Sequence, residues 1–593
     1  MSLAKYLSVI AIITWAGASP GQSASGRAGN FDGPAELPRV YMHSAVSDTP
    51  SPGRSTLVKR GDDLQRAIDK ASCGDTLRLE AGAQWLGVVH LPAKPCDDQH
   101  WITLRSSAED AALPAEGKRL TPCYAGVASL PGRPEYACGA PRNVLAKLVM
   151  DQSGTGPILF QEGANHYRLI DLEITRAWPG KIVYNLIAAE KDKAYSHVVL
   201  DRVWVHGSAQ DETTRGLMLT GADHIAVVDS YFSDFHCVAL TGACVDSQAI
   251  AGGLGDRPSG VFKIVNNFLE ASGQSLLFGG GEATQTPADI EIRHNHMFKP
   301  LTWQAGASGF VGGDSGRPFI VKNLFELKNA ERVLVEGNLM ENVWGGFTQA
   351  GFAILLTPKN QNNHCPICKV DDVTLRFNRV RRMASGIQIA SGLSDAGAAS
   401  AGAARISIHD SLFDEMDGTA YRGLGVFAQI SSNVPSLRDI SIVHNTAFPP
   451  KALLIVGGKP DADRMSNFIF SGNLMTLGDT DIISTGGGPQ NCAFQPVLQG
   501  PAGVLKSCFT TYKVEGNVLS GSKGKWPENN LTPSEAGLAD FREGRGGDYR
   551  LCRDKADPHP NCKKPSPGLH AAPDGRAAGA DLEAVKSATE TVE

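Results

Sequence analysis

The sequence lacks an excess of charge of either sign and, beyond its N-terminus, any long apolar run. It carries 56 Lys and Arg against 62 Asp and Glu in 593 residues, a formal net charge of −6, and the basic residues are scattered. We therefore expect no nucleic-acid partner, since such proteins carry a basic stripe or patch. No later stretch approaches the ~20 consecutive apolar residues that a membrane span requires.

The N-terminus has the organisation of a cleaved secretory signal. Lys5 precedes an apolar stretch over residues 6–15, which ends in Ala16, Gly17 and Ala18. A cationic start, an apolar centre too short to span a bilayer and a small-residue exit are typical of signal peptides. We predict a signal peptide over residues 1–18 and a secreted or periplasmic protein without membrane attachment after cleavage. The alternative is an uncleaved anchor.

The twelve cysteines are even in number and form couples that are close in sequence. Such spacing predicts short-loop disulfides in an oxidising compartment. One couple has the C-x-x-C spacing of redox and zinc motifs, but it stands alone in a polar loop, so a disulfide is preferred there too. The expected couples are Cys73 with Cys96, Cys123 with Cys138, Cys237 with Cys244, Cys365 with Cys368, Cys492 with Cys508, and Cys552 with Cys562.

The sequence is also poor in helical periodicity, and its 65 glycines indicate many turns. Instead, one short pattern recurs from about residue 166: alternating apolar residues, a polar pair usually ending in Asn, and a second apolar pair. Examples are IVNNFL at 264–269 and VEGNLM at 335–340. The apolar period of two indicates strands, and the recurrence about every 28 to 44 residues indicates a solenoid. The recurring anchors are Asn267, Asn295, Asn338, Asn378, Asn445, Asn473 and Asn517.

Strands that each add in parallel to their predecessor form a β-helix. An Asn at the same corner of every coil can hydrogen-bond the Asn above and below, and it tolerates left-handed backbone geometry. The sequence therefore predicts an all-β chain with a single elongated β-helix of about ten or more coils. We expect the Asn side chains of consecutive coils to stack inside one corner.

These features resemble the pectate-lyase-like superfamily of right-handed parallel β-helices. The N-terminal segment adds to the resemblance with DLQRAID at 63–69, read as an amphipathic helix, and GDTLRL at 74–79, a strand after a Gly-Asp turn. The resemblance implies a capping helix and a β-helix within 61–564, preceded by an N-terminal extension over 19–60. Residues 565–593 are rich in Ala, Gly and Pro without a period, so we expect a flexible tail there. The superfamily contains lyases, hydrolases, epimerases and non-catalytic fibres, so the resemblance concerns fold more than chemistry.

A candidate site lies on the strand that precedes the Asn-bearing strand of each coil. The outward positions of these strands are small or neutral, except for Glu326 and Lys328, which point the same way in mid-solenoid; Lys322 shares their parity. Long loops over 279–288, 357–369 and 390–404 follow these strands as expected walls of one groove. The alternative is an ordinary surface ion pair, worth under ~1 kcal/mol.

Further residues are expected to converge on the same ligand. Arg293 supplies a cation, Glu282 closes a glycine-rich turn, and Trp303 lies in an insertion that could stack on a sugar ring. The expected catalytic residues are Glu326, Lys328, Arg293 and Lys322; the expected substrate-binding residues are Glu282, Asp246, Trp303, His296 and Lys359.

Two enzyme mechanisms fit this set, and a third interpretation is a non-catalytic glycan-binding solenoid. In a lyase acting on an acidic polysaccharide, a base removes the proton α to a uronate carboxyl while cations stabilise the enolate. Lys328 or Lys322 with Arg293 supplies this set, provided that burial and nearby cations lower the lysine pKa. In a hydrolase, Glu326 with Glu282 or Asp246 flanks the bond. Glu282 and Glu326 could hold Ca²⁺, which the superfamily resemblance implies as a helper. The chain has no G-H-G, W-x-D-H, R-x-P-x-x-R or D-P-H-[DE] motif, so a lyase of unfamiliar type is preferred.

Overall fold

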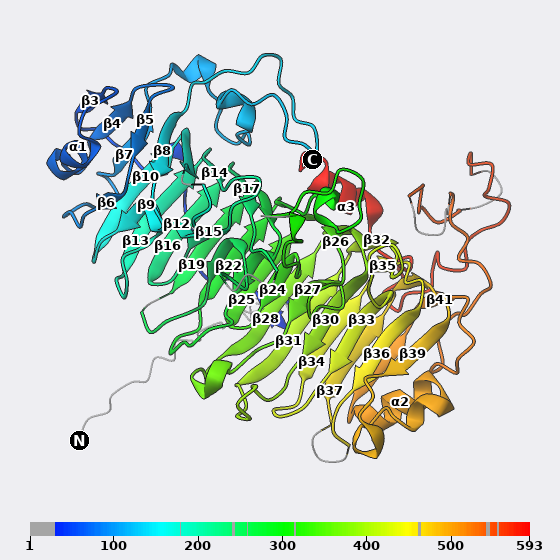
Figure 1. Ribbon diagram of the computed structural model, residues 1–593. Helices are drawn as coiled ribbons and strands as arrows, with labels where there is room; N and C mark the ends of the chain where they lie inside the picture. Colours follow the sequence, from blue (N-terminus) through cyan, green and yellow to red (C-terminus); the bar gives the residue numbers. More distant parts are fainter. Residues whose placement is uncertain are drawn as a thin grey trace, which may run out of the picture.

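The computed structural model describes residues 30–592, except 178, 240–242, 258, 314–315, 461–463, 541–545 and 554–556. The expected signal peptide at 1–18 lies outside the described residues. Most described residues belong to three long parallel sheets that run side by side along the molecule (Figure 1).

From β4 onward, successive strands of each sheet are three strands apart in the chain, so each coil contributes one strand to every sheet. The 14-stranded sheet contains β3 (Ser55–Val58), β4 (Thr76–Leu79), β7 (Ile102–Ser106), β10 (Ala164–Ile170), β13 (Tyr195–Asp201), β16 (Ala222–Val228), β19 (Gly260–Val265), β22 (Ala288–Arg293), β25 (Ala330–Glu336), β28 (Lys369–Arg376), β31 (Gly402–His409), β34 (Arg438–Val443), β37 (Ser466–Ser471) and β40 (Tyr512–Glu515).

The 13-stranded sheet contains β5 (Gln84–Leu86), β8 (Ala146–Met150), β11 (Leu172–Arg176), β14 (Trp204–His206), β17 (Tyr231–Phe235), β20 (Phe268–Ala271), β23 (His296–Phe298), β26 (Leu339–Val343), β29 (Arg379–Met383), β32 (Leu412–Met416), β35 (Thr446–Ala447), β38 (Leu474–Thr476) and β41 (Val518–Ser520). The 12-stranded sheet contains β6 (Val89–Leu91), β9 (Gly154–Phe160), β12 (Val183–Ala189), β15 (Thr213–Met218), β18 (Gln248–Gly252), β21 (Gln274–Phe278), β24 (Phe325–Leu327), β27 (Phe352–Leu356), β30 (Ser385–Ala390), β33 (Val426–Ser431), β36 (Ala452–Gly457) and β39 (Thr480–Ser484).

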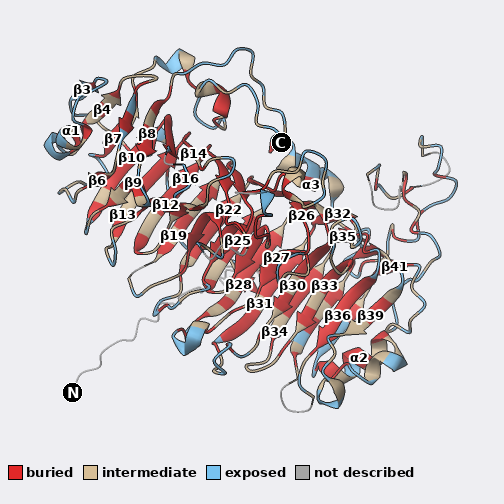
Figure 2. Ribbon diagram, in the orientation of Figure 1, coloured by how far each residue is buried: buried red, intermediate tan, exposed pale blue. Residues whose placement is uncertain are grey.

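The strands pair in parallel throughout these sheets, and the chain is the right-handed parallel β-helix that the sequence predicts. The alternating apolar residues of all three sheets point inward into one continuous core, which Figure 2 shows as buried strands along the whole solenoid. Ile264, Ile292 and Val335 occupy equivalent positions on consecutive coils and are fully buried. Each such side chain contributes roughly 1.5–3 kcal/mol of burial.

The expected asparagine stack is confirmed at the corner between the 14- and 13-stranded sheets. Nδ2 of Asn267 donates to Oδ1 of Asn295 at 3.0 Å, and the same 3.0 Å bond joins Asn295 to Asn338 and Asn338 to Asn378. Ser411 takes the next position before the stack resumes at Asn445, Asn473 and Asn517 and ends on Asn530.

Two terminal segments pack on the outside of the solenoid. β1 (Phe31–Asp32) and β2 (Ala35–Glu36) form a hairpin against the 14-stranded sheet, where Asp32 pairs with Arg376 at 2.7 Å. Residues 565–592, expected to be a flexible tail, are instead packed: Val585 of α3 (Leu582–Thr589) is buried in a cluster with Leu412 of the 13-stranded sheet. The outer face of that sheet is apolar here, so burial offsets the ordering of the segment.

Three short helices accompany the strands among the described residues. The helix expected near residue 63 is present as α1 (Leu64–Lys70), capped by the Asp63 side chain, and its Leu64 and Ile68 join the core. That α1 closes the end of the stack stays a prediction. α2 (Pro501–Cys508) lies near the other end, and no helix among the described residues is long and apolar enough to cross a membrane.

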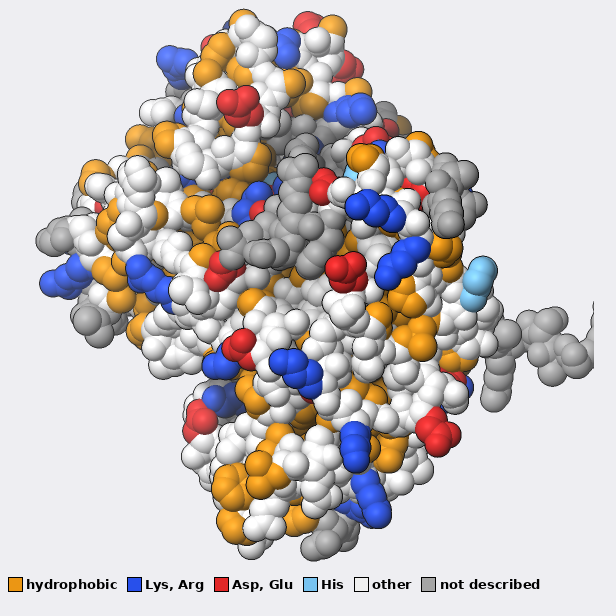
Figure 3. Space-filling model, turned by 90° about the vertical axis from the view of Figure 1, so that its right-hand side faces the viewer, with side chains coloured by type: hydrophobic (Ala, Val, Ile, Leu, Met, Phe, Trp, Pro, Cys, Tyr) orange, Lys and Arg blue, Asp and Glu red, His pale blue; other side chains and the backbone are white. Residues whose placement is uncertain are grey.

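All six expected disulfides are present, with Cα–Cα distances of 5.1 to 5.6 Å that fit the usual range. Cys365 and Cys368 are therefore bonded to each other, which excludes a thiolate metal site there. On the face shown in Figure 3, acidic and basic side chains are interspersed.

Candidate active site

Glu326 and Lys328 lie on the outer side of the 12-stranded sheet. Phe325 and Leu327 of β24 point into the core, so Glu326 between them faces outward. Its neighbours in register are Leu277 on one side and Leu355 on the other. The predicted alternation of this strand is therefore confirmed.

The Glu326 carboxylate is held by partners on both oxygens. Lys328 Nζ lies 2.9 Å from Oε1, and Gln274 Nε2 donates to Oε2 at 2.5 Å. Gln274 in turn accepts from Gln248 Nε2 at 2.9 Å. Glu326 is 3% exposed, so its carboxylate is buried, and a role of this ion pair beyond structure stays a prediction.

Lys328 is a cation at neutral pH. Burial alone would lower its pKa, but the attraction of the Glu326 carboxylate outweighs burial and raises the pKa above its usual value. Its side chain remains 19% exposed, so the ammonium group can still contact a ligand. A protonated lysine stabilises negative charge, whereas proton abstraction would require its neutral form.

A second ion pair lies beside the first. Lys322 Nζ is 3.1 Å from Asp246 Oδ2, and both side chains are partly exposed. Asp246 also acts electrostatically on Lys328. Two expected catalytic residues and an expected binding residue thus come together with Glu326.

Arg215 is a member of this group that sequence reasoning missed. It is in register with Gln248, which is in register with Gln274. Burial lowers the pKa of Arg215, and the Asp246 carboxylate partly opposes that effect. Its Nε has no hydrogen-bond partner among the described residues. The register between the strands of Arg215 and Gln248 does not follow from the sequence, so Arg215 was not among the expected site residues. We call Arg215, Asp246, Lys322, Glu326 and Lys328 the charged cluster.

The three expected wall loops contact one another and form one wall. Glu282 of the first loop pairs with His364 of the second at 3.0 Å. Lys359 of the second pairs with Asp395 of the third at 2.7 Å. Glu282 is more than half exposed and belongs to this wall, so its partner is His364 and not Glu326.

Three other expected residues lie elsewhere. Arg293 is on β22 of the 14-stranded sheet and pairs with Glu291 at 2.6 Å. His296 is on β23 of the 13-stranded sheet, where it contacts Glu341 at 2.8 Å. Trp303 is 1% exposed in an apolar cluster and offers no face for a sugar. Arg293 and His296 therefore belong to sheets other than that of Glu326, and Trp303 is part of an apolar cluster.

The expected calcium ligands are not brought together by any contact found here. Glu326 is occupied by Lys328 and Gln274, while Glu282 pairs with His364. A calcium ion at these carboxylates stays a prediction. The one group of His, Cys, Asp or Glu side chains among the described residues with metal-compatible spacing lies on another sheet.

The three parallel sheets define the class as right-handed parallel β-helix proteins. No protein-family model matches the sequence, and no curated protein matches it. Solved structures with this fold include an alginate lyase from Paenibacillus sp., 13% identical over 73% of this chain and 96% of its own, with a TM-score of 0.29. An exopolygalacturonase of family 28 from Yersinia enterocolitica is 11% identical, covering 80% and 79%, with a TM-score of 0.34. A mannuronan C-5 epimerase module from Azotobacter vinelandii is 11% identical, covering 78% and 95%, with a TM-score of 0.30. At such identities the likeness concerns the fold alone.

Proposed function

We propose that the protein is exported to the periplasm or beyond and acts on an acidic polysaccharide, as a lyase, at the charged cluster. The observation that carries the proposal is the composition of this cluster, in which three cations stand against two carboxylates. The side chains of two of the cations, Lys322 and Lys328, are partly exposed to solvent. An anionic ligand would satisfy the surplus positive charge. The six disulfides fit an oxidising compartment.

The charged cluster supplies the parts that β-elimination needs. Lys328 and Lys322 are placed to neutralise a uronate carboxylate and stabilise the enolate that forms when its α proton leaves. Glu326 contacts Lys328 and is the carboxylate to which we assign proton abstraction. The enolate then forms a carbon–carbon double bond, the bond from the β carbon to the glycosidic oxygen breaks, and that oxygen takes a proton from solvent. Arg215 adds a third positive charge, which interacts electrostatically with the Asp246 carboxylate.

A hydrolase is the second candidate, because the charged cluster contains two carboxylates, Asp246 and Glu326. Glycoside hydrolysis uses one carboxyl group as acid and another as base or nucleophile. Incubation with a panel of uronate-containing and neutral glycans separates the candidates. The absorbance of an unsaturated uronate product indicates a lyase, new reducing ends without it indicate a hydrolase, and binding with neither indicates a glycan-binding solenoid.

The test of the charged cluster uses Glu326→Gln and the double variant Glu326→Gln with Lys328→Met. We expect either to lower turnover about 10²-fold or more, the usual effect of losing a transition-state contact. Lys328→Ala alone would leave a buried carboxylate unpaired, at a cost of about 3–5 kcal/mol, so the double variant keeps the fold testable. The matched control is the exposed Lys513 and Glu515 pair, also two residues apart on a strand and 2.7 Å from each other. Full activity of the folded double variant would refute the assignment.

A further inference from the structure

Three histidines from consecutive coils stack at the surface of the 14-stranded sheet. His166 of β10, His197 of β13 and His224 of β16 each have a positive φ, between 50° and 55°. Their rings lie 4.6 Å and 4.8 Å apart and within 10° of parallel. The spacing is that of adjacent strands, so the coil repeat itself places the imidazoles in a column.

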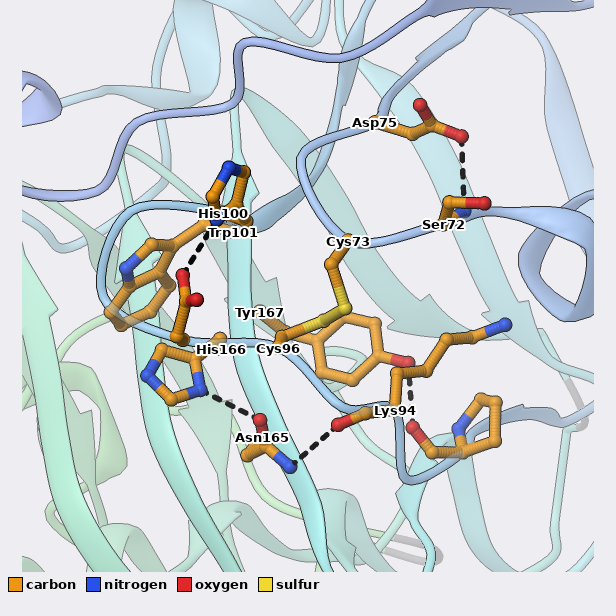
Figure 4. Close-up of a disulfide and its surroundings, with 12 residues drawn as sticks. Ser72, Cys73, Asp75, Lys94, Cys96, His100, Trp101, Asn165, His166 and Tyr167 are labelled. Carbon is orange, nitrogen blue, oxygen red and sulfur yellow. Dashed lines mark hydrogen bonds and ion pairs between the residues drawn. A yellow bond between two sulfur atoms is a disulfide. The ribbon is translucent and has the colours of Figure 1, made fainter.

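One end of this column is covered by the loop that follows the first disulfide. Cys96, bonded to Cys73, fixes the start of the loop, and Trp101 at its end packs edge-on against His166 with 4.9 Å between ring centroids (Figure 4). Between them, Asp98 brings Oδ1 to 3.1 Å from Nε2 of His166. One ligand atom from each of Asp98, His166 and His197 lies within 4.8 Å of the other two.

The hydrogen bonds around His166 fix which ring nitrogen carries a proton. Asn165 donates from Nδ2 to the carbonyl oxygens of Lys94 and Gly163, at 3.1 and 2.8 Å. Its Oδ1 therefore faces Nδ1 of His166, 2.6 Å away, and must accept a hydrogen bond from an N–H at Nδ1 (Figure 4). In the neutral imidazole, the lone pair of Nε2 then points at the Asp98 carboxylate. That contact is repulsive unless a cation lies between the two atoms.

His197 repeats the arrangement one coil further on. Its Nδ1 lies 3.1 Å from Oγ of Ser196, the residue in register with Asn165. Nε2 of His197 has no hydrogen-bond partner among the described residues. Both imidazoles are thus held through Nδ1 by a polar residue one position earlier, as metal-ligating histidines commonly are.

We propose that Asp98, His166 and His197 bind a divalent transition-metal ion, with Zn²⁺ as the first choice. Two imidazole nitrogens and one carboxylate oxygen suit Zn²⁺, Ni²⁺ or Cu²⁺, whereas Ca²⁺ takes oxygen ligands. Asp98 is 78% exposed at its side chain, so an ion can enter from solvent, and water completes the coordination. The site lies on a different sheet from the charged cluster, and the proposal is independent of the proposed function.

Metal binding is measured on the full chain without a polyhistidine tag, by calorimetry with Zn²⁺ and by the visible spectrum with Co²⁺. We expect one tight Zn²⁺ per chain and Co²⁺ bands in the wild type. Asp98→Asn and His197→Gln should each weaken Zn²⁺ binding about 10²-fold or more, since even residues behind the ligands contribute 10- to 100-fold. His364→Gln, which removes an exposed histidine that also pairs with a carboxylate, should change nothing.

The fold of each variant is checked by its melting temperature without metal, which Asp98→Asn should leave unchanged because its side chain is exposed. In the wild type Zn²⁺ should raise the melting temperature, and in the Asp98 variant it should not. Zn²⁺ binding that is absent from the wild type, or equal in the wild type and both ligand variants, would overturn the proposal. The contact of His166 with Asp98 would then be a proton-mediated ion pair.

Discussion

Replacing one asparagine inside the stack tests whether this corner stabilises the solenoid. Asn338 is fully buried. Its Oδ1 accepts from the backbone N–H of Asn295 at 2.9 Å and from the Asn295 side chain at 3.0 Å. Its Nδ2 donates to Oδ1 of Asn378 and to the backbone oxygen of Ile292, both at 3.0 Å. Asn338→Ala removes these bonds and leaves the Asn295 backbone N–H without its acceptor.

The magnitude follows from these contacts. An orphaned buried donor costs about 1–3 kcal/mol, and each lost hydrogen bond contributes about 0.5–1.5 kcal/mol. We therefore expect Asn338→Ala to lower the free energy of unfolding by about 4 kcal/mol. Asn338→Ser should cost about half as much, because serine already serves at position 411, where its Oγ accepts from the backbone N–H of Asn378 at 3.2 Å.

Urea unfolding of both variants measures the difference, with Gln361→Ala as the control, since Gln361 makes one exposed side-chain hydrogen bond in a loop. The control should lie within about 0.5 kcal/mol of the wild type. Equal costs for alanine and serine, or a cost under about 1 kcal/mol for alanine, would refute the reasoning. Stability would then come from the apolar core alone.

Two further predictions concern buried cations. Burial alone would lower the pKa of His409, but its hydrogen bonds with Asp32 and Asp410 outweigh burial and raise the pKa to about 9. Because the folded pKa exceeds the unfolded value of 6.5, the stabilisation of up to about 3 kcal/mol is fully present below pH 6.5 and is lost as the pH rises through 9. In urea titrations, the difference in unfolding free energy between the wild type and His409→Gln should therefore shrink between pH 6.5 and 9. A difference that stays constant with pH would contradict this prediction. Lys299 is fully buried and donates to three backbone oxygens at 2.6 to 2.9 Å, so Lys299→Met should lower the free energy of unfolding by about 3 kcal/mol or more, and an unchanged unfolding midpoint would show that these oxygens find other donors.

The fold was predictable because its signals repeat. Each coil repeats the apolar alternation and the corner asparagine, so one coil that departs from the pattern does not hide it; Ser230 and Ser411 stand at the asparagine corner without breaking the series. The disulfides were predictable because each closes a short loop. Asn530, which ends the stack, is only 13 residues after Asn517 and could not be found from a period of about 28 or more.

The candidate site was only partly predictable, because strand parity does not tell which of three sheets a residue faces. Glu326 and Lys328 were found from parity within one strand. Arg293 has the outward parity too, but on a neighbouring sheet. Arg215 was missed because its register with Gln248 on the next coil does not follow from the sequence. The packing of residues 565–592 could not be anticipated, since their partner is the apolar outer face of another sheet and not a pattern of their own.

The stacking of coils also explains why surplus charge at one place carries information. Equivalent residues of adjacent coils lie about 4.8 Å apart, so like charges in one column repel and opposite charges attract. In one column of the 14-stranded sheet the charges alternate in sign: Asp289 pairs with Arg332 at 2.8 Å, and Arg405 with Asp372 at 2.6 Å.

The 12-stranded sheet departs from this rule at the charged cluster. Three cations meet two carboxylates there, and one cation, Arg215, is largely buried with an unpartnered Nε among the described residues. Burying a cation without full pairing costs free energy. An anionic ligand at the charged cluster would supply the missing negative charge. The excess of positive charge, more than any single residue, is therefore the reason to test acidic glycans first.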